Sequence, residues 1–274
     1  MSFITVGTNH VYSPIELREK ISFSKNRLRD ALDFLRETGV MEGAVILSTC
    51  NRVEIYASAD IAEAGIYEIK NFLSRFYEIN EKDLNPYLYI YRDRDAVRHL
   101  FRVSSGLDSL IIGELQILGQ VRAAFYESER AGFTGYLLKD VFNSAVSAAG
   151  KVHAMTGISE GKVSVGSTAV DFIKERTKTL SGRYILIIGV GKVTGLVLKY
   201  LKKEGKNVVF VSNRTFRKAQ SLAKDIGARA VRFDNLKEYL RKADIVITAT
   251  KSPHYITVSY THLRAHETVL DLVC

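Results

Sequence analysis

Apolar and polar residues follow two different periods in the N-terminal third of the chain. Short apolar runs and runs that alternate with polar residues are typical of strands, and they predict strands at residues 3–9, 44–49, 53–58 and 86–92. Apolar residues spaced three to four apart are typical of amphipathic helices, and they predict helices at residues 24–39 and 61–77. The resulting order βαββαβ predicts a ferredoxin-like split unit.

The pattern changes twice further along the chain. Residues 93–180 have helical spacing, with glycine-containing breaks at 104–106, 132–135 and 157–161. Beyond them, the run GRYILIIGVGKVTGLVLKYLKKEGKNVVFVSNRT is a strand, a glycine turn, a helix and a second strand, which is the opening of a Rossmann-type domain. We therefore expect an α/β protein in four parts: a domain at 1–155, a helical linker at 156–180, an incomplete Rossmann-type domain at 181–258, and a tail at 259–274.

Composition limits the function classes. No stretch is long and apolar enough to span a membrane, and the N-terminus lacks the basic and apolar regions of a signal peptide. Two cysteines give no disulfide framework, so we expect a cytoplasmic protein. The net charge of +9 suits an anionic partner such as RNA or a phosphorylated cofactor, although the charge alone favours a solvated basic surface over RNA binding.

The glycine turn indicates a nucleotide. Gly189, Gly191 and Gly195 follow a strand and open a helix, where glycine lets a backbone approach a pyrophosphate. Arg214 ends the next strand, where an NAD site has an acidic residue, and therefore favours the 2′-phosphate of NADP. The alternative is a structural βαβ unit without a cofactor.

A cysteine lies in a polar turn between two predicted strands. Cys50 is flanked by Thr49, Asn51 and Arg52. Arg52 could promote the thiolate or hold a substrate carboxylate in a bidentate fork. The alternative is an inert small residue in a turn.

A second group of polar residues occupies the predicted helices after residue 93. His99 follows Asp95 by four positions, so that Asp95 could orient the ring. Gln116 and Gln120 share a helix face, with Ser109 and Glu114 before or at its start. Each residue alone is explained by a solvated surface. Together with a thiol and an arginine, they suggest a pocket for an amino acid.

Four stretches carry a family resemblance: VGTNHVYSPIELREKISF, STCNRVEIYA, GLDSLIIGELQILGQV and the glycine turn. They resemble glutamyl-tRNA reductase over residues 3–257. The resemblance implies NADPH-dependent reduction of glutamyl-tRNA to glutamate-1-semialdehyde through a Cys50 thioester, the first step of five-carbon 5-aminolevulinate and porphyrin (tetrapyrrole) synthesis. It makes Cys50 the nucleophile and His99 an accessory residue.

The same resemblance assigns two binding sites. The substrate pocket would contain Thr49, Cys50, Asn51, Arg52, Ser109, Glu114, Leu115, Gln116 and Gln120. The NADP phosphates would lie at Gly189, Val190, Gly191, Lys192, Val193 and Thr194. The chain departs from the family pattern at Leu115, where many relatives have proline, and at Gly195, which shifts the third glycine of the turn.

Two other classes compete with this interpretation. One is a non-catalytic tRNA-binding or regulatory relative, and the other is a shikimate-type NADP-dependent dehydrogenase. The resemblance further implies a homodimer formed by a helical domain that this chain lacks, and an aminomutase as partner. Residues 259–274 do not resemble the family. His262 and His266 in that tail have metal-ligand spacing, but two histidines are weak evidence and we assign no metal.

Overall fold

The computed structural model describes residues 1–159, 165–177, 179–202, 208–250 and 270–271. They form two compact units, Met1–Gly161 and Lys162–Cys274. Within the described ranges, the structure has no helix that is both long enough and apolar enough to cross a membrane.

The first unit is built on a four-stranded antiparallel sheet. Its strands are β1 (Ser2–Asn9), β2 (Met41–Ser48), β3 (Arg52–Ala59) and β4 (Tyr89–Arg92). The strand order is β2-β3-β1-β4, so the predicted ferredoxin-like βαββαβ unit is confirmed.

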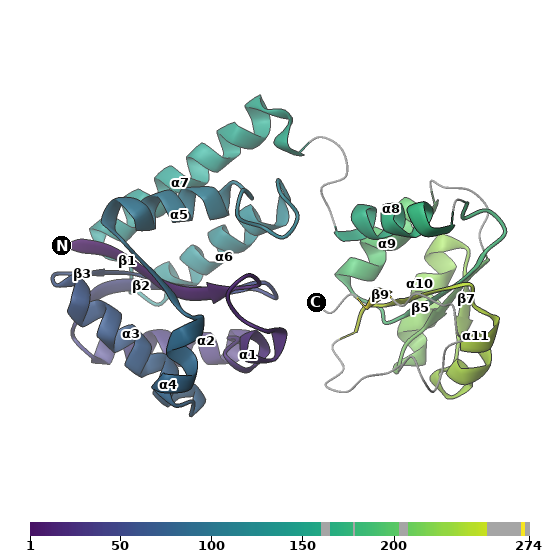
Figure 1. Cartoon of the computed structure of the whole chain (residues 1–274), viewed down its shortest axis with the longest axis horizontal. Helices are drawn as coiled ribbons and strands as arrows, with labels where there is room; N and C mark the ends of the chain where they lie inside the picture. The colour runs from purple at the N-terminus through teal and green to yellow at the C-terminus, as the bar shows by residue number, and fades with distance from the viewer. Residues whose placement is uncertain (160–164, 178, 203–207, 251–269, 272–274) are drawn as a thin grey trace. The chain divides into compact units, whose positions relative to one another are not determined.

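Helices cover both faces of this sheet (Figure 1). One face carries α1 (Ile15–Lys20), α2 (Lys25–Glu37), α3 (Ala62–Tyr77) and α4 (Glu81–Leu84), which the short helix η1 (Asn85–Tyr87) follows. The other carries α5 (Asp93–Ser104), α6 (Gln116–Arg130) and α7 (Tyr136–Met155), which is followed by η2 (Gly157–Ser159).

Strand alternation divides the apolar residues between two cores. Ile4, Ile46 and Ile55 pack with α2 and α3, whereas Phe3 and Tyr56 pack with α5, α6 and α7. Because both faces of the sheet are covered, every residue of β3 is buried. Any charged residue on β3 therefore needs a partner inside the protein.

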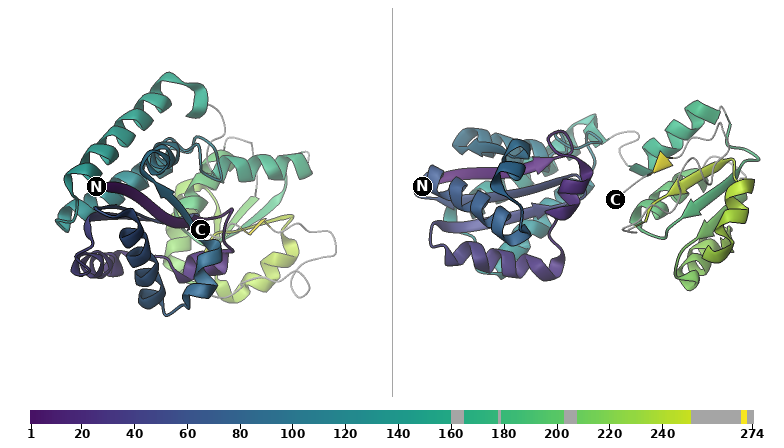
Figure 2. Two further views of the ribbon diagram at one scale, coloured as in Figure 1. Left: turned by 60° about the vertical axis from the view of Figure 1, so that its left-hand side comes forward. Right: turned by 60° about the horizontal axis from the view of Figure 1, so that its bottom comes forward.

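The second unit contains a parallel sheet in the order β7-β6-β5-β8-β9. Its strands are β5 (Tyr184–Ile188), β6 (Val208–Ser212), β7 (Arg229–Val231), β8 (Ile245–Thr248) and β9 (Leu270–Asp271). Its helices are α8 (Val165–Thr177), α9 (Lys192–Leu201), α10 (Phe216–Ile226), η4 (Phe233–Asn235) and α11 (Leu236–Lys242). The order outward from β5 is that of a Rossmann-type half, as predicted. Figure 2 shows this sheet from two further directions.

The structure adds detail to two of the predicted parts. Within the predicted linker 156–180, the described residues 165–177 form α8, which buries Ala169, Val170 and Ile173 in one core with β5 and β8. The close approach of Gly166 to the backbone of Leu196 and Val197 fixes α8 on α9. Residues 270–271 of the predicted tail pair with β8 as a fifth strand. The other residues of 259–274 lie outside the described residues.

Candidate active site

The cysteine turn joins β2 to β3 and is held from three directions. The Thr49 side-chain oxygen accepts hydrogen bonds from the backbone N–H groups of Asn51 and Arg52, each at 3.1 Å. The backbone N–H of His10 donates to the Asn51 carbonyl at 2.9 Å, and Arg18 Nε donates to the Cys50 carbonyl at 3.4 Å. Cys50 itself is exposed. The local structure therefore presents an accessible thiol on a turn whose backbone is fixed.

Directly after this turn, Arg52 points into the protein. Its side chain is 1% exposed, and its Nη1 lies 2.7 Å from Glu54 Oε1. Its Nη2 donates to the Asp108 carbonyl at 2.5 Å and to Asp108 Oδ2 at 3.1 Å. Burial by itself lowers the pKa of Arg52, but Glu54 and Asp108 raise it above its ordinary value. Arg52 is thus a fixed cation engaged with two carboxylates, and its predicted contact with a substrate carboxylate stays a prediction.

Glu54 is the centre of a buried polar network. Its Oε1 receives Arg52 Nη1, His99 Nε2 at 2.7 Å and the Tyr89 hydroxyl. Its Oε2 accepts from the Tyr56 hydroxyl at 2.5 Å. Burial alone would raise the pKa of Glu54, but Arg52, His99 and Tyr56 hold it well below its usual range. The carboxylate is therefore ionised in a fully buried position.

A glycine makes room for this network. Gly7 on β1 pairs with Glu54 on one side and with Tyr89 on the other. A Cβ at Gly7 would lie 2.6 Å from the Val53 carbonyl oxygen and 2.8 Å from Glu54 Cγ. Because Gly7 has no side chain, Glu54 packs against the backbone of β1, and the Tyr89 hydroxyl donates to Glu54 across the intervening strand.

His99 is placed differently from the sequence-based expectation. It is buried on α5, and its Nε2 contacts Glu54 rather than Asp95. Asp95 instead pairs with Arg98 at 3.3 Å on the exposed face of the helix. The expected Asp95–His99 pair is therefore wrong, because Asp95 points to solvent while His99 points to the sheet.

The segment between α5 and α6 brings further polar groups to Arg52. Asp108 contacts its guanidinium directly, as described above. The neighbouring Glu114 is half-buried, and burial raises its pKa, with Ser109 and Arg52 opposing that rise. Glu114 is therefore near both Ser109 and Arg52, and the substrate roles of Ser109 and Glu114 stay predictions. Leu115 is 57% exposed, and Gln116 and Gln120 lie on the first turns of α6 with exposed and partly exposed side chains. The substrate roles of these three residues stay predictions.

The residues of this site that were missed from the sequence are His10, Arg18, Glu54 and Asp108, together with Gly7, Tyr56 and Tyr89 around Glu54. The signal for Glu54 was present in the sequence R-x-E-x-Y at 52–56, because residues two apart on a strand share a face. A carboxylate between an arginine and a tyrosine on a strand buried on both faces indicates an internal network. No comparable local signal marks Asp108, whose partner is distant in the sequence.

The glycine turn has the geometry that a phosphate group needs. Gly189 has φ 104°, and a Cβ there would lie 2.1 Å from the Ala249 carbonyl oxygen, so only glycine fits. Gly191 precedes the first residue of α9, and a Cβ there would meet nothing within 4 Å. The buried Thr194 donates from Oγ1 to the Gly189 carbonyl at 3.1 Å and closes the turn. The open space at a helix N-terminus fits a dinucleotide phosphate.

The remaining predicted cofactor residues surround this turn. Val190 and Val193 are partly buried, and Val193 packs on the core beneath α9. Arg214 is exposed just beyond β6, where a 2′-phosphate would be reached. Lys192 begins α9, but its side chain is outside the described part of the structure. No group of three His, Cys, Asp or Glu suited to a metal ion occurs among the described residues, which exclude His262 and His266.

Fold and site together define the class: a two-domain α/β protein with a cysteine turn on a ferredoxin-like unit and a nucleotide-type turn on a Rossmann-type unit. Residues 6–156 match the family described as glutamyl-tRNAGlu reductase, N-terminal domain, and residues 171–269 match shikimate / quinate 5-dehydrogenase. Because the first match covers more than half of the chain, the chain belongs to the glutamyl-tRNA reductase family. The second match also extends into the segment 259–274.

Individual relatives agree with this assignment. A glutamyl-tRNA reductase of Desulfitobacterium hafniense (strain DSM 10664 / DCB-2) is 42% identical over 253 residues, covering 92% of this chain and 57% of the relative. That of Moorella thermoacetica is 43% identical over 257 residues, covering 93% and 58%. The solved glutamyl-tRNA reductase from Methanopyrus kandleri has a TM-score of 0.56 at 36% identity, covering 93% of this chain and 60% of the other. The chain thus spans less than two thirds of the length of these relatives.

Proposed function

We propose that this chain is the substrate- and nucleotide-binding part of an NADPH-dependent reductase that converts glutamyl-tRNA to glutamate-1-semialdehyde. The observation that carries the proposal is the exposed Cys50 on a fixed turn above the buried Arg52–Glu54 pair. Cysteine is the natural nucleophile for an activated acyl ester. A surface cysteine of no function would not need a turn held by Thr49, His10 and Arg18.

The chemistry follows from the position of the thiol. The Cys50 thiolate attacks the carbonyl carbon of the aminoacyl ester, and the bond from that carbon to the tRNA oxygen breaks. The tRNA leaves as a hydroxyl that gains a proton, and a glutamyl thioester remains on Cys50. When bound, NADPH would supply the hydride that reduces the acyl group to the aldehyde, and the bond from the acyl carbon to the Cys50 sulfur would break to return the thiolate.

The substrate pocket of this proposal consists of residues from two segments. They are Thr49, Asn51 and Arg52 of the turn, and Ser109, Glu114, Leu115, Gln116 and Gln120 before and on α6. His99 supports the site from α5. On the second unit, residues 189–194 and Arg214 bind NADPH. We further propose that the longer family protein acts in the cytoplasm as a homodimer and passes its reactive aldehyde to an aminomutase.

Thioester trapping tests the acyl-transfer step. The chain is incubated with glutamate-labelled glutamyl-tRNA in the absence of NADPH, and labelled peptides are identified by mass spectrometry. We expect label on Cys50 and none in Cys50→Ser, which keeps the side-chain volume but lacks the thiol. Absence of label from a folded wild-type chain would refute the proposal. Turnover of a hydroxy acid without tRNA would instead favour a shikimate-type dehydrogenase.

A further inference from the structure

We propose that Glu54 is a positioning residue, which fixes the tautomer of His99 and the orientation of Arg52 beneath the cysteine turn. It acts through these two residues and does not itself contact the substrate. The kinetic part of this inference rests on the proposed function. The structural part, which concerns the protonated nitrogen of His99, does not.

The tautomer follows from the partners of Glu54. Arg52 and the two tyrosine hydroxyls act as hydrogen-bond donors to Glu54, and an ionised carboxylate can only accept hydrogen bonds. His99 Nε2, at 2.7 Å from Oε1, must therefore carry a hydrogen. In the neutral ring, Nδ1 is then the unprotonated nitrogen, available to accept a proton or a hydrogen bond.

The orientation of Arg52 follows from the same carboxylate. Glu54 holds Nη1 at 2.7 Å, while the Asp108 carbonyl and carboxylate hold Nη2. Both terminal nitrogens of the guanidinium are thus held by hydrogen bonds, and the group cannot rotate without breaking a contact between buried charges. Arg52 is the first residue of β3, and Cys50 lies in the turn just before it. The contacts of Arg52 therefore also fix this end of the turn that carries the thiol.

The sheet is built to accommodate this arrangement. Arg52, Glu54 and Tyr56 lie at alternate positions of β3 and share one face, and Gly7, which pairs with both Glu54 and Tyr89, leaves the space that Glu54 occupies. A merely structural network would also bury these groups. The two roles are distinguished by measurements on His99 and Cys50, because a structural role alone predicts no effect on either once the protein is folded.

The first test uses the wild-type chain and needs no substrate. Histidine labelled with ¹⁵N reports which ring nitrogen carries hydrogen, and the His99 signals are assigned by their loss in His99→Gln. We expect the Nε2–H tautomer for the neutral ring. A neutral His99 with hydrogen on Nδ1 would overturn the inference, whatever any variant does.

The second test compares Glu54→Gln with the matched control Glu63→Gln, because Glu63 forms an exposed pair with Arg92 outside the network. The glutamine can donate as well as accept, so we expect a mixture of His99 tautomers and a rate of Cys50 acylation lowered by about 100-fold, the effect of a small misplacement of reacting groups. Glu63→Gln makes the same chemical change on the surface, so the tautomer of His99 and the rate of Cys50 acylation should remain near those of the wild type.

The outcomes separate this inference from the proposed function. Folded Glu54→Gln with wild-type tautomer and wild-type acylation refutes the positioning role. If the wild-type chain is not acylated at all, the proposed function fails, while a tautomer change in Glu54→Gln still supports the positioning role. Should Glu54→Gln fail to fold, the wild-type tautomer measurement decides the question.

Discussion

At the residue scale, the ionised state of Glu54 depends on its neighbours. A carboxylate transferred alone into a protein interior is strongly destabilised, and removing one partner of a buried pair costs about 3–5 kcal/mol. Here Arg52, His99 and two tyrosines compensate for the lost water. The network stabilises the fold only while all of its members are present.

This dependence predicts how stability varies with pH. Because the pKa of Glu54 in the folded protein lies below its ordinary value of 4.5, the unfolded chain takes up this proton first as pH falls. The contribution of Glu54 is present above its unfolded pKa and is lost through the acid range below it. Glu54→Gln should therefore lower the free energy of unfolding by about 3–5 kcal/mol at neutral pH, and by progressively less below about pH 4.5.

Urea denaturation at several pH values checks this prediction. The matched control is Glu63→Gln, because Glu63 forms an exposed pair with Arg92 at 3.3 Å. Such surface pairs are worth about 0–1 kcal/mol, so this variant should follow the wild-type curve. Parallel acid profiles for wild type and Glu54→Gln would contradict the buried, ionised state of Glu54.

Two glycines of the nucleotide turn make a second prediction at this scale. A side chain at Gly189 would strike the Ala249 carbonyl, whereas one at Gly191 meets open space. Gly191→Ala should leave the melting temperature nearly unchanged and weaken NADPH binding at least tenfold, because the methyl group occupies the space of a phosphate. Gly189→Ala should destabilise the second unit itself.

Calorimetric titration with NADPH and thermal melting separate these effects. Weakened binding with unchanged stability in Gly191→Ala supports a phosphate at this turn. Unchanged affinity in that variant would mean that the phosphate lies elsewhere.

At the scale of elements, the residue at position 7 of β1 determines whether the Glu54 side chain fits on β3. Gly7 lies between Glu54 and Tyr89, and any side chain there would collide with the backbone of β3. We expect Gly7→Ala to destabilise the first unit by about 1–3 kcal/mol or more, as overpacking does. The control is Gly119→Ala, since Gly119 lies on α6 with open space around its Cα and alanine favours a helix. Thermal melting of both variants is the measurement, and equal stability would contradict the proposed role of Gly7.

The elements also show what the sequence could predict. Short apolar or alternating runs at β1, β2, β3 and β4, separated by segments with helical spacing, were sufficient for the ferredoxin-like order. The partner of His99 was not predictable in this way. Asp95 is its neighbour on the same helix, whereas Glu54 reaches it from a strand forty-five residues away, and only tertiary packing decides between them. Likewise, the amphipathic spacing of α8 predicted a helix but not the unit on which it packs.

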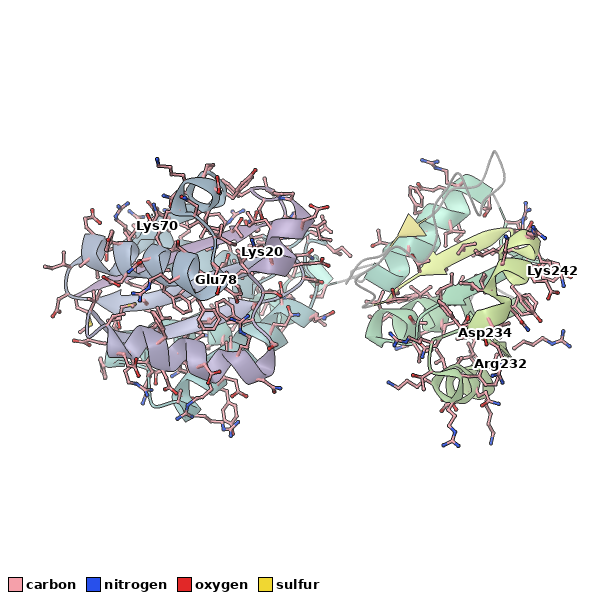
Figure 3. The ribbon with its side chains drawn as sticks, turned by 90° about the horizontal axis from the view of Figure 1, so that it is seen from below. Lys20, Lys70, Glu78, Arg232, Asp234 and Lys242 are labelled. Atoms are coloured by element: carbon pink, nitrogen blue, oxygen red, sulfur yellow. The ribbon has the colours of Figure 1, made fainter. Side chains whose placement is uncertain are left out.

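At the scale of the whole molecule, the net charge and the two units agree with the proposal that one unit carries the acyl-transfer site and the other the nucleotide site. The net charge of +9 suits a polyanionic partner such as tRNA. Figure 3 shows labelled charged side chains projecting from each unit, including Lys20 and Lys70 on the first and Arg232 and Lys242 on the second. Lys242 pairs with Glu238, and Lys70 is partly buried, so a basic surface of the folded units accounts for part of this charge without a bound polyanion.

Because the hydrophobic cores of the first unit are its own, we predict that this unit folds and reacts with glutamyl-tRNA without the second unit. Both of its hydrophobic cores are formed by residues up to position 145, and the described residues of the second unit contribute none to them. A fragment of residues 1–161 should therefore fold and acquire label from glutamyl-tRNA on Cys50, because the turn, Arg52 and the Glu54 network all lie within it. It should form no aldehyde with NADPH, because the nucleotide turn at 189–194 is absent. Circular dichroism and thioester trapping on the fragment and the whole chain test this directly. A folded fragment that is not labelled, beside a whole chain that is, would show that the second unit contributes to acyl transfer as well as to reduction.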